Sequence, residues 1–292
     1  MSKSGLTISC IIEASSANYG ESVGNIAQLK KMTRAGGKVY TYISRQALRY
    51  NIVQQMRVDN TPVTNTSKVV QFAPEAQIDE YPEIDLFGYM KTEKKGSNVK
   101  GDQAIRSAVV RLSNAVSLEP YKADTDFLTN IGLAKREDFD NAIAQSEIHK
   151  SFYAYTITVD LDKIGIDGEI EISNEEKSKR VVMLLDTIEF LYRDIRGRRE
   201  NLNPVFSIGG VYERKNPYFE DRLQLDKNDP SKLNVALISS VLNSNEDTKN
   251  NTTAGILSNI FSNDDEIKGA VNAVSISEMF NELKKKVMEY YG

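Results

Sequence analysis

The sequence has few of the residues from which catalytic and metal sites are usually built. It contains one cysteine, Cys10, and one histidine, His149, in 292 residues. A single cysteine excludes an internal disulfide framework, and a histidine with no second ligand at suitable spacing excludes a structural zinc site. Gly96 and Gly101 flank KGSNVKG, which matches neither a Walker loop nor a dinucleotide fingerprint. We therefore expect no metal, no cofactor and no catalytic constellation, and we expect His149 to have a packing or surface role.

Long apolar segments are also absent. The longest apolar runs, such as residues 181–185 (VVMLL), are far shorter than the roughly 20 residues that span a bilayer. The first residues, MSKSGLTISC, lack the long apolar stretch of a secretory signal. Hydrophobic residues make up 40% of the chain and charged residues 27%, which is typical of a folded globular protein. We expect a cytoplasmic protein without a membrane partner.

Acidic residues are missing from one stretch of an otherwise acidic chain. The formal net charge is −4, which by itself argues against nucleic acid as a partner. Residues 22–58 nevertheless contain no Asp or Glu, and their basic residues are Lys30, Lys31, Arg34, Lys38, Arg45, Arg49 and Arg57. Such a cluster indicates a nucleic-acid surface. The alternative is a solvated face whose cations pair with carboxylates elsewhere in the fold.

The hydrophobic pattern of the first half predicts a strand, a helix and further strands. Residues 6–12 (LTISCII) predict a buried strand, followed by an irregular polar segment over 13–25. Residues 39–43 predict a strand, and Ser44 is placed to cap a helix from Arg45 to about Arg57. Its core face is expected to contain Ala47, Leu48, Ile52 and Met56. Arg45 and Arg49 are four residues apart and should share another face.

The remaining pattern contains four strands, two long helices and two long insertions. Strands are expected over 84–90, 104–115, 151–161 and 205–212, an irregular insertion over 58–82, and an irregular or mixed insertion over 117–150. A helix over 175–196, capped by Asn174 and stopped by Gly197, and a last helix capped by Ser277 are expected as well. Residues 234–242 suit an edge strand or a short helix, and 243–253 a mobile surface loop. The order predicts an α+β fold with the ferredoxin-like arrangement that also underlies RNA recognition motifs.

Residues 13–51 (EASSANYGESVGNIAQLKKMTRAGGKVYTYISRQALRYN) closely resemble the DevR family. Further resemblance follows in order at IDLFGYM, at residues 107–120, at HKSFYAYTITVDLDKIG and at RGRRENLNPVFSIGGVY. DevR proteins are the type I-B form of the CRISPR Cascade backbone subunit, the seventh in the Cas nomenclature, within the RAMP superfamily. The resemblance spans most of the chain.

The resemblance implies a single hand-like domain. The palm would comprise about 5–57, 83–115 and 151–242, with a finger insert at about 58–82, a thumb insert at about 116–150 and a C-terminal helix at about 277–291. Several copies would stack along one CRISPR guide RNA, with other Cascade subunits as partners, and present the guide for pairing with target DNA. Sequence recognition would then belong to base pairing, and the protein would contact the RNA backbone and shape.

The chemistry of the side chains and the resemblance together predict which residues bind RNA. Ser44, Arg45, Gln46 and Arg49 lie at the start of a helix whose N–H groups can bind phosphate, and Lys30, Lys31 and Lys38 can line the track. The resemblance implies that Asn18 and Asn25 lie in the RNA-facing loop, and that Met90 and the adjacent Lys91 lie beside a displaced base. It places Phe127 or Leu128 at the thumb tip. It also implies that further contacts to the RNA backbone are made by Arg198, Arg199 and Asn201. Met90 could instead pack in the core, and Phe127 within the thumb. The aromatic signature of RNA recognition motifs is missing, so base stacking on the sheet is not expected.

Two other functions stay open at this point. Some RAMP relatives cleave RNA, with a histidine or with an acidic residue in the loop after the first strand, where this sequence has Glu13 and Glu21. The family name also suggests a transcriptional regulator, although no helix-turn-helix signature is present. We expect a binding protein without enzymatic activity.

Overall fold

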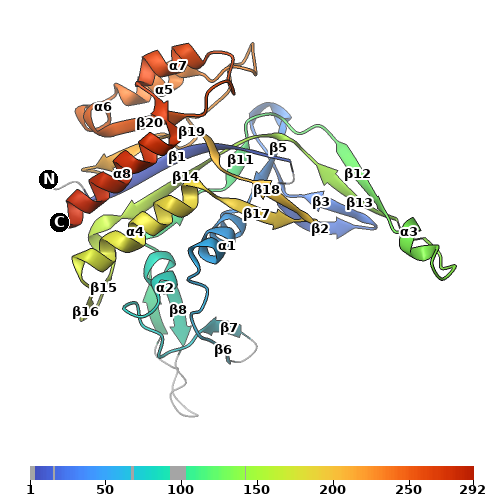
Figure 1. The fold of residues 1–292 in the computed structure, drawn as a ribbon, viewed down its shortest axis with the longest axis horizontal. Helices are drawn as coiled ribbons and strands as arrows, with labels where there is room; N and C mark the ends of the chain where they lie inside the picture. The colour runs from blue at the N-terminus through green and yellow to red at the C-terminus, as the bar shows by residue number, and fades with distance from the viewer. Residues whose placement is uncertain (1–3, 16, 67–68, 93–102, 142) are drawn as a thin grey trace.

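A nine-stranded sheet forms the centre of the molecule (Figure 1). The computed structural model describes residues 4–15, 17–66, 69–92, 103–141 and 143–292. The strand order is β21-β20-β19-β1-β14-β11-β5-β4, with β10 also paired to β14. The strands are β1 (Gly5–Ala14), β4 (Lys31–Thr33), β5 (Val39–Ile43), β10 (Val110–Leu112), β11 (Ala115–Ser117), β14 (Ser151–Asp160), β19 (Pro204–Tyr212), β20 (Thr252–Ile256) and β21 (Val274–Ser275).

The two faces of the sheet are covered by different helices. Leu6, Ile8 and Cys10 of β1 alternate onto one face, where they join a core with α1 (Arg45–Met56), α4 (Asn174–Glu189) and α8 (Ile276–Tyr291). Ile11 faces the other way, into a second core under α5 (Val235–Leu242) and α7 (Asp264–Val271), near α6 (Glu246–Asn251). Because both faces are covered, β1 and β19 are buried almost throughout.

A side module, residues 61–92 and 103–106, extends from the sheet below α1 (Figure 1). Its elements are β6 (Val63–Thr66), β7 (Val69–Phe72), α2 (Pro82–Phe87), β8 (Tyr89–Thr92) and β9 (Gln103–Arg106). Buried Asp85 joins the module to α4 and to the loop before β15, since its carboxylate accepts bonds from Arg180 at 2.8 Å and the Gly165 N–H at 2.9 Å, and it also accepts a bond from Arg106 of the module at 2.6 Å. The short pair β15 (Ile166–Asp167) and β16 (Ile170–Glu171) follows next to it.

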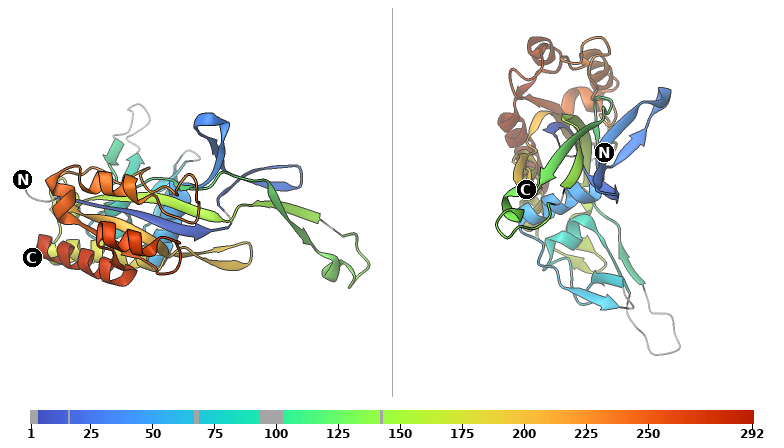
Figure 2. Two further views of the ribbon diagram at one scale, coloured as in Figure 1. Left: turned by 90° about the horizontal axis from the view of Figure 1, so that it is seen from above. Right: turned by 90° about the vertical axis from the view of Figure 1, so that its right-hand side faces the viewer.

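An arm, residues 19–29 and 124–148, projects from the other end of the sheet (Figure 2). It is a four-stranded sheet of β12 (Asp124–Thr129), β13 (Ile143–Ile148), β3 (Ile26–Leu29) and β2 (Tyr19–Val23), with α3 (Ile131–Ala134) at its end. Strands β13 and β3 pair in parallel. Glu147 ties the arm together, because its carboxylate accepts the Leu29 N–H at 2.8 Å and pairs with Lys31 at 2.7 Å.

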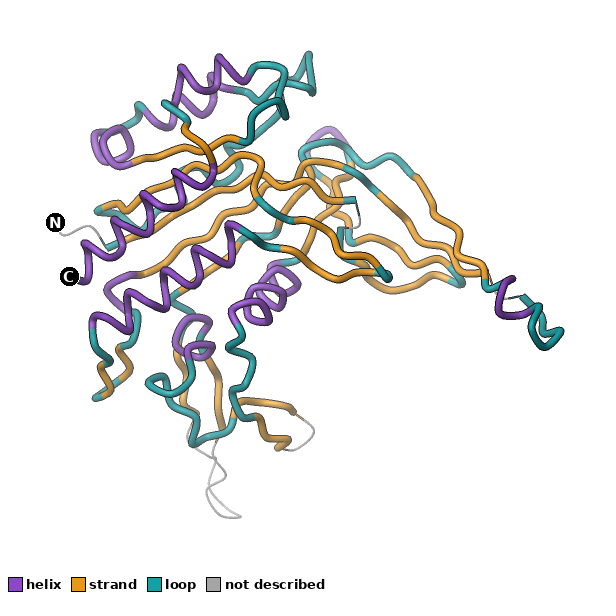
Figure 3. The backbone as a smooth tube through the Cα atoms, viewed as in Figure 1, coloured by secondary structure: helices purple, strands orange, loops and turns teal. Residues whose placement is uncertain are grey.

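A hairpin of β17 (Tyr192–Ile195) and β18 (Arg198–Asn201) leaves the end of α4 and runs beside the arm (Figure 3). Its turn uses positive φ angles at Arg196 (48°) and Gly197 (74°), as a two-residue hairpin turn requires. The buried Arg193 pairs with Glu200 at 2.7 Å and donates to the Ala17 carbonyl at 3.0 Å. These contacts fix the hairpin to the end of β1.

Several sequence predictions are confirmed. Strands occur at β1, β5, β14 and β19, and Ser44 caps α1 from Arg45 onward, with its Oγ accepting the Ala47 N–H. Residues 234–242 take the helical alternative, as α5 with Asn234 as its cap. Among the described residues, no helix has the length and apolar character that a membrane crossing requires.

Three predicted elements are wrong in part. The strand expected over 84–90 begins as helix α2, because Pro82 occupies its first turn, and only Tyr89 onward is extended. The helix expected over 175–196 ends at Glu189, and Gly197 is the turn of the hairpin rather than a helix stop. The expected strand over 104–115 is divided into β9, β10 and the start of β11.

Two segments expected to be irregular contain regular structure. Residues 58–82 include strands β6 and β7. Residues 13–25 are regular in part, as strand β2, and 117–150 take the mixed alternative, with β12 and β13. The expected surface loop over 243–253 holds α6, whose cap Asn245 accepts the Thr248 N–H. The predicted caps Asn174 and Ser277 are replaced by Ser173 and Ser275, one and two residues earlier.

Candidate nucleic-acid interface

A groove, here the first groove, opens at the N-terminus of α1 and has a volume of about 780 Å³. It lies over β5, β10 and β14 and is bounded by residues 215–220. Its lining is almost entirely polar or charged, and it includes Lys30, Tyr42, Ser44, Arg45, Gln46, Arg111, Asn114, Thr158, Lys215 and Glu220. Such a lining suits a polar, anionic ligand.

The start of α1 is held by two asparagine side chains. Ser44 donates its hydroxyl to Asn18 Oδ1 at 2.6 Å, and the Arg45 N–H donates to Asn114 Oδ1 at 2.9 Å. The Ala47 N–H is already taken by Ser44 Oγ at 3.3 Å. The N–H groups of Arg45 and Ala47 are therefore engaged within the protein and are not free for a phosphate, and Asn18 positions the helix cap.

Two cations of the first groove have no carboxylate partner in the described part of the chain. They are Lys30, just before β4, and Arg45, the first residue of α1. Arg111 and Lys215 also line the groove, but Arg111 pairs with Asp160 at 3.1 Å and Lys215 pairs with Asp162. Sequence reasoning missed both. For Arg111 the only signal was an outward-facing cation next to the buried Val110.

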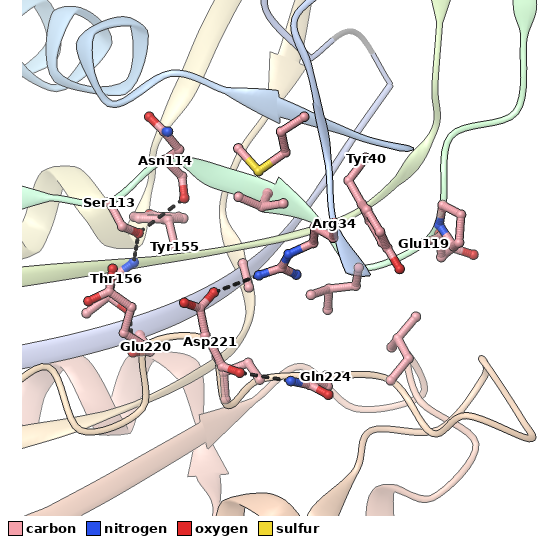
Figure 4. A pocket seen from close by; sticks show the side chains of 18 of the residues that line it. Arg34, Tyr40, Ser113, Asn114, Glu119, Tyr155, Thr156, Glu220, Asp221 and Gln224 are labelled. Atoms are coloured by element: carbon pink, nitrogen blue, oxygen red, sulfur yellow. Dashed lines mark hydrogen bonds and ion pairs between the residues drawn. The ribbon is translucent and has the colours of Figure 1, made fainter. Parts of the chain in front are cut away.

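A second groove of about 690 Å³ adjoins the first and shares Ser113, Asn114, Thr156 and Glu220 with it (Figure 4). The ion pair between Arg34 and Asp221, 3.0 Å long, crosses it. Lys38 and Tyr40 lie on the same side as Arg34. Lys38, like Lys30 and Arg45, has no ion pair with any carboxylate that the structure describes.

Three of the seven cations in residues 22–58 pair with carboxylates elsewhere in the fold, as the alternative explanation of this acid-free stretch predicts. Lys31 pairs with Glu147, Arg34 with Asp221 and Arg49 with Glu83. The Arg49 guanidinium lies 5.0 Å from the ring centre of Phe87, and burial lowers its pKa. Arg49 lines a hollow between α1 and the side module instead of the first groove. Arg45 and Arg49 therefore line different hollows, and the predicted RNA contact of Arg49 stays a prediction.

Met90 and Lys91 lie in the side module and point in different directions. Met90 is 58% exposed and stands opposite the exposed Ile105, so the core-packing alternative is wrong. Lys91 is only 4% exposed; its ammonium group donates to the Ala76 carbonyl and lies 4.1 Å from the ring centre of Tyr89. Burial lowers the pKa of Lys91. This placement argues against the predicted RNA contact of Lys91.

Phe127 and Leu128 lie on β12 of the arm and are 61% and 67% exposed. Packing of Phe127 within the arm is therefore wrong. The end of the arm carries further exposed apolar side chains, Ile131, Leu133, Phe139 and Ile143. Asn25 belongs to the arm too, since its carbonyl accepts the Gln145 N–H at 3.0 Å, and it lines neither groove.

The predicted residues after the second long helix lie on the β17–β18 hairpin. Arg199 pairs with Asp194 at 2.9 Å and stacks over Tyr192 at 4.4 Å, while Arg198 pairs with Glu200 at 3.1 Å. Asn201 Oδ1 accepts the Asn203 N–H at 2.8 Å. Arg198, Arg199 and Asn201 line neither groove, so they do not share a surface hollow with Lys30 and Arg45.

The residues considered for catalysis have structural contacts. His149 is buried, its Nδ1 lies 2.8 Å from Thr41 Oγ1, and burial lowers its pKa. Glu13 pairs with Lys150 at 2.6 Å, whereas the side chain of Glu21 lies outside the described residues. In the described ranges, no group of three or more His, Cys, Asp or Glu side chains is placed to hold a metal ion.

Solved structures share this fold. A chain from a structure titled "CRISPR RNA-guided surveillance complex, pre-nicking" has a TM-score of 0.60 at 13% identity, covering 96% of this chain and 100% of that one. A chain titled "CRISPR RNA-guided surveillance complex" has a TM-score of 0.58 at 15% identity, covering 97% and 99%. At these identities the likeness shows the fold alone, a mixed α/β fold.

Sequence comparison defines the family. A protein from Myxococcus xanthus strain DK1622, "CRISPR-associated protein Cas7/Cst2/DevR", is 30% identical over 122 residues, which are 38% of this chain and 40% of that protein's length. The family model "CRISPR-associated negative auto-regulator DevR/Csa2" matches residues 6–226. The chain belongs to the DevR/Csa2 family.

Proposed function

We propose that this protein binds CRISPR guide RNA as the backbone subunit of a type I-B Cascade. Several copies hold one guide, together with other Cascade subunits, and present it for pairing with target DNA. The observation that carries the proposal is the first groove, where Lys30 and Arg45 stand without carboxylate partners at the start of α1. Family membership and the fold shared with surveillance-complex chains support it.

The arrangement of the central strands supports a ferredoxin-like palm. Strands β19, β1, β14 and β10/β11 are neighbours in this order, with α1 between β1 and β10 and α4 between β14 and β19 in the chain. This is the βαββαβ order of the ferredoxin-like fold. In this proposal the side module is the finger and the arm is the thumb.

The groove suits an RNA backbone better than a base sequence. Lysine and arginine bind phosphates through charge and carry no sequence information by themselves. Lys30 and Arg45 supply cations to the first groove, and Lys38 supplies one to the second, which also contains the acids Glu119, Glu220, Asp221 and Asp226. The guide can therefore have any sequence, which is what a protein that serves many guides needs.

We propose further that the protein does not cleave RNA. A general base must reach the proton that it removes, and His149 is buried between Thr41 and the ring of Tyr121. Glu13 is engaged by Lys150. Both contacts support a binding role.

Purification after expression with the neighbouring genes and a CRISPR array tests the proposal. We expect a large multi-subunit particle that contains RNA of uniform length and several copies of this chain. A monomer without RNA would contradict the proposal. RNA cleavage at defined positions that is lost in His149→Ala, Glu13→Ala or Glu21→Ala would instead identify an endoribonuclease.

A further inference from the structure

Asn114 lies where the two grooves meet and lines both of them (Figure 4). It occupies the short connection between β10 and β11. Its backbone carbonyl accepts the hydroxyl of Ser113 at 3.1 Å, and that hydroxyl accepts the Thr156 N–H of β14 at 2.9 Å. The position of Asn114 is therefore fixed by the central sheet.

The contact with α1 also fixes the orientation of the Asn114 amide. The Arg45 N–H lies 2.9 Å from Oδ1, and an N–H group donates only to the amide oxygen. The Nδ2 group is consequently the free end of the side chain, and its two donors have no acceptor in the described part of the chain. A fixed amide with two free donors therefore stands next to Arg45, the cation proposed to bind phosphate.

We infer that Asn114 donates a hydrogen bond to a ribose 2′-hydroxyl and so makes the groove prefer RNA over DNA. This inference rests on the proposed function. It assigns Asn114 as a residue that determines specificity for the sugar, in addition to the cations that bind phosphate.

The chemistry of the groove favours a sugar hydroxyl over a base edge. Asparagine reads adenine through a bidentate contact that uses both its oxygen and its nitrogen. In Asn114 the Arg45 N–H already engages Oδ1, whereas Nδ2 has no partner in the described part of the chain, so a contact that uses Nδ2 alone fits the side chain as it stands. A 2′-hydroxyl is uncharged, can accept a hydrogen bond from Nδ2, and lies on the ribose carbon next to the one that carries the 3′-phosphate. Tyr42 and Thr158 add hydroxyl groups to the same lining.

The variant Asn114→Asp tests the inference with little change in shape. A carboxylate retains an oxygen for the Arg45 N–H and suits a helix N-terminus, but it has no donors. The measurement is the affinity of the full chain for a 20-nucleotide oligouridine RNA and for the 2′-deoxy oligomer of the same sequence. The added negative charge weakens the complexes with RNA and with DNA alike, so the quantity to compare between variants is the ratio of the RNA affinity to the DNA affinity. We expect the preference for RNA to fall about three-fold to ten-fold, the value of one hydrogen bond.

Asn174→Asp, which adds the same charge at the exposed start of α4, is the matched control and should leave the ratio at its wild-type value. Asn114→Ala, checked by thermal melting, gives a second test without a new charge. An unchanged ratio in both Asn114 variants would overturn the inference and indicate a phosphate contact. If an Asn114 variant changed the preference between oligouridine and oligoadenine while the ratio of RNA to DNA affinity stayed constant, the inference would be overturned in favour of a base contact. A wild-type chain that binds neither oligomer would contradict the proposed function, and with it this inference.

Discussion

The basic residues between positions 22 and 58 differ in what their side chains contact. Lys30 and Arg45 face the first groove, whereas Arg49 lies against Phe87 and Glu83. Sequence spacing alone put Arg45 and Arg49 together, because residues four apart share a helix face. The side module determines the actual partner of Arg49, and no local pattern predicts that contact.

Lys30→Ala combined with Arg45→Ala should weaken RNA binding without unfolding the protein. Each lost phosphate contact should reduce the slope of log affinity against log salt by about one, so the double variant should lose about two. Because neither side chain pairs with a described carboxylate, the free energy of unfolding should change by less than about 0.5 kcal/mol. Filter binding and denaturant melts measure the two quantities.

Two controls separate binding from stability. Lys179→Ala with Lys285→Ala removes the same charge from the outer faces of α4 and α8 and should leave the salt slope unchanged. Arg49→Ala should leave the slope unchanged and lower stability by about 0.5–1 kcal/mol, since it removes a cation–π contact. A reduced slope in Arg49→Ala would restore Arg49 to the RNA surface.

The single histidine predicts a specific pH dependence. Burial lowers the pKa of His149 below the value of about 6.5 that it has in the unfolded chain. The unfolded chain therefore takes up a proton first, and His149 reduces stability as the pH falls below about 6.5. Burial raises the pKa of Glu83 and Glu220, so these two groups increase stability as the pH falls. The contribution of His149 is therefore measured by comparing wild type with a variant that lacks this histidine.

Denaturation at pH 7.5 and 5.5, compared between wild type and His149→Gln, measures this contribution. Wild type should lose more stability between the two pH values than the variant. The NMR titration of the only imidazole should give a pKa below 6.5. An imidazole that titrates at or above this value would show that His149 is not held in its neutral form.

At the scale of elements, the sequence predicted the structure where burial imposes a regular pattern. The strand at 6–12 and the helix after Ser44 were predicted because their apolar residues face defined cores. Strand β12 was missed because all its residues, DTDFLT, are exposed and so show no alternation. The helix predicted to Arg196 was too long because Tyr192 and Ile195 continue the apolar spacing while belonging to a hairpin.

The candidate site was predicted in part for the same reason. The charge pattern identified Lys30 and Arg45, which lie in one stretch of the chain. Asn114 and Lys215 enter the groove from distant segments, and only the pairing of β10 with β14 and the course of residues 214–226 bring them there. Such contacts depend on tertiary structure, which local patterns do not contain.

The side module should depend on the buried carboxylate of Asp85. Asp85→Asn removes the negative charge between the buried Arg106 and Arg180 and should destabilise the protein by about 3–5 kcal/mol. Asp79→Asn, at an exposed carboxylate in the same module, is the control and should be nearly neutral. Equal melting curves for the two variants would show that this ion cluster does not stabilise the fold.

The arm should serve assembly along the guide. Phe127→Asp with Leu128→Asp should leave the monomer folded, because both side chains are exposed, but should damage ordered assembly. The new carboxylates remove an apolar contact and repel phosphate. Nuclease protection of bound guide RNA should give a regular ladder for wild type and lose it in the variant. An unchanged ladder, with circular dichroism showing an intact fold, would exclude the arm tip from this role.

At the scale of the whole molecule, the charge distribution of this acidic protein is compatible with the proposed anionic ligand. The net charge is −4, yet the first groove is lined by Lys30, Arg45, Arg111 and Lys215 with Glu220 as the acid among them. Because salt screens charges beyond about 10 Å at 0.1 M, the acids on distant surfaces affect a bound phosphate little. Net charge is therefore a poor guide to the ligand of this chain.

The most direct test of the central claim is a filter-binding titration of the purified chain with two 20-nucleotide RNAs of unrelated sequence, between 50 and 200 mM salt. Phosphate contacts release counterions, so the affinity should fall steeply and linearly on a logarithmic scale as salt rises. The two RNAs should give the same line, since the groove contacts the backbone. A flat salt dependence, or a strong preference for one sequence, would contradict the account.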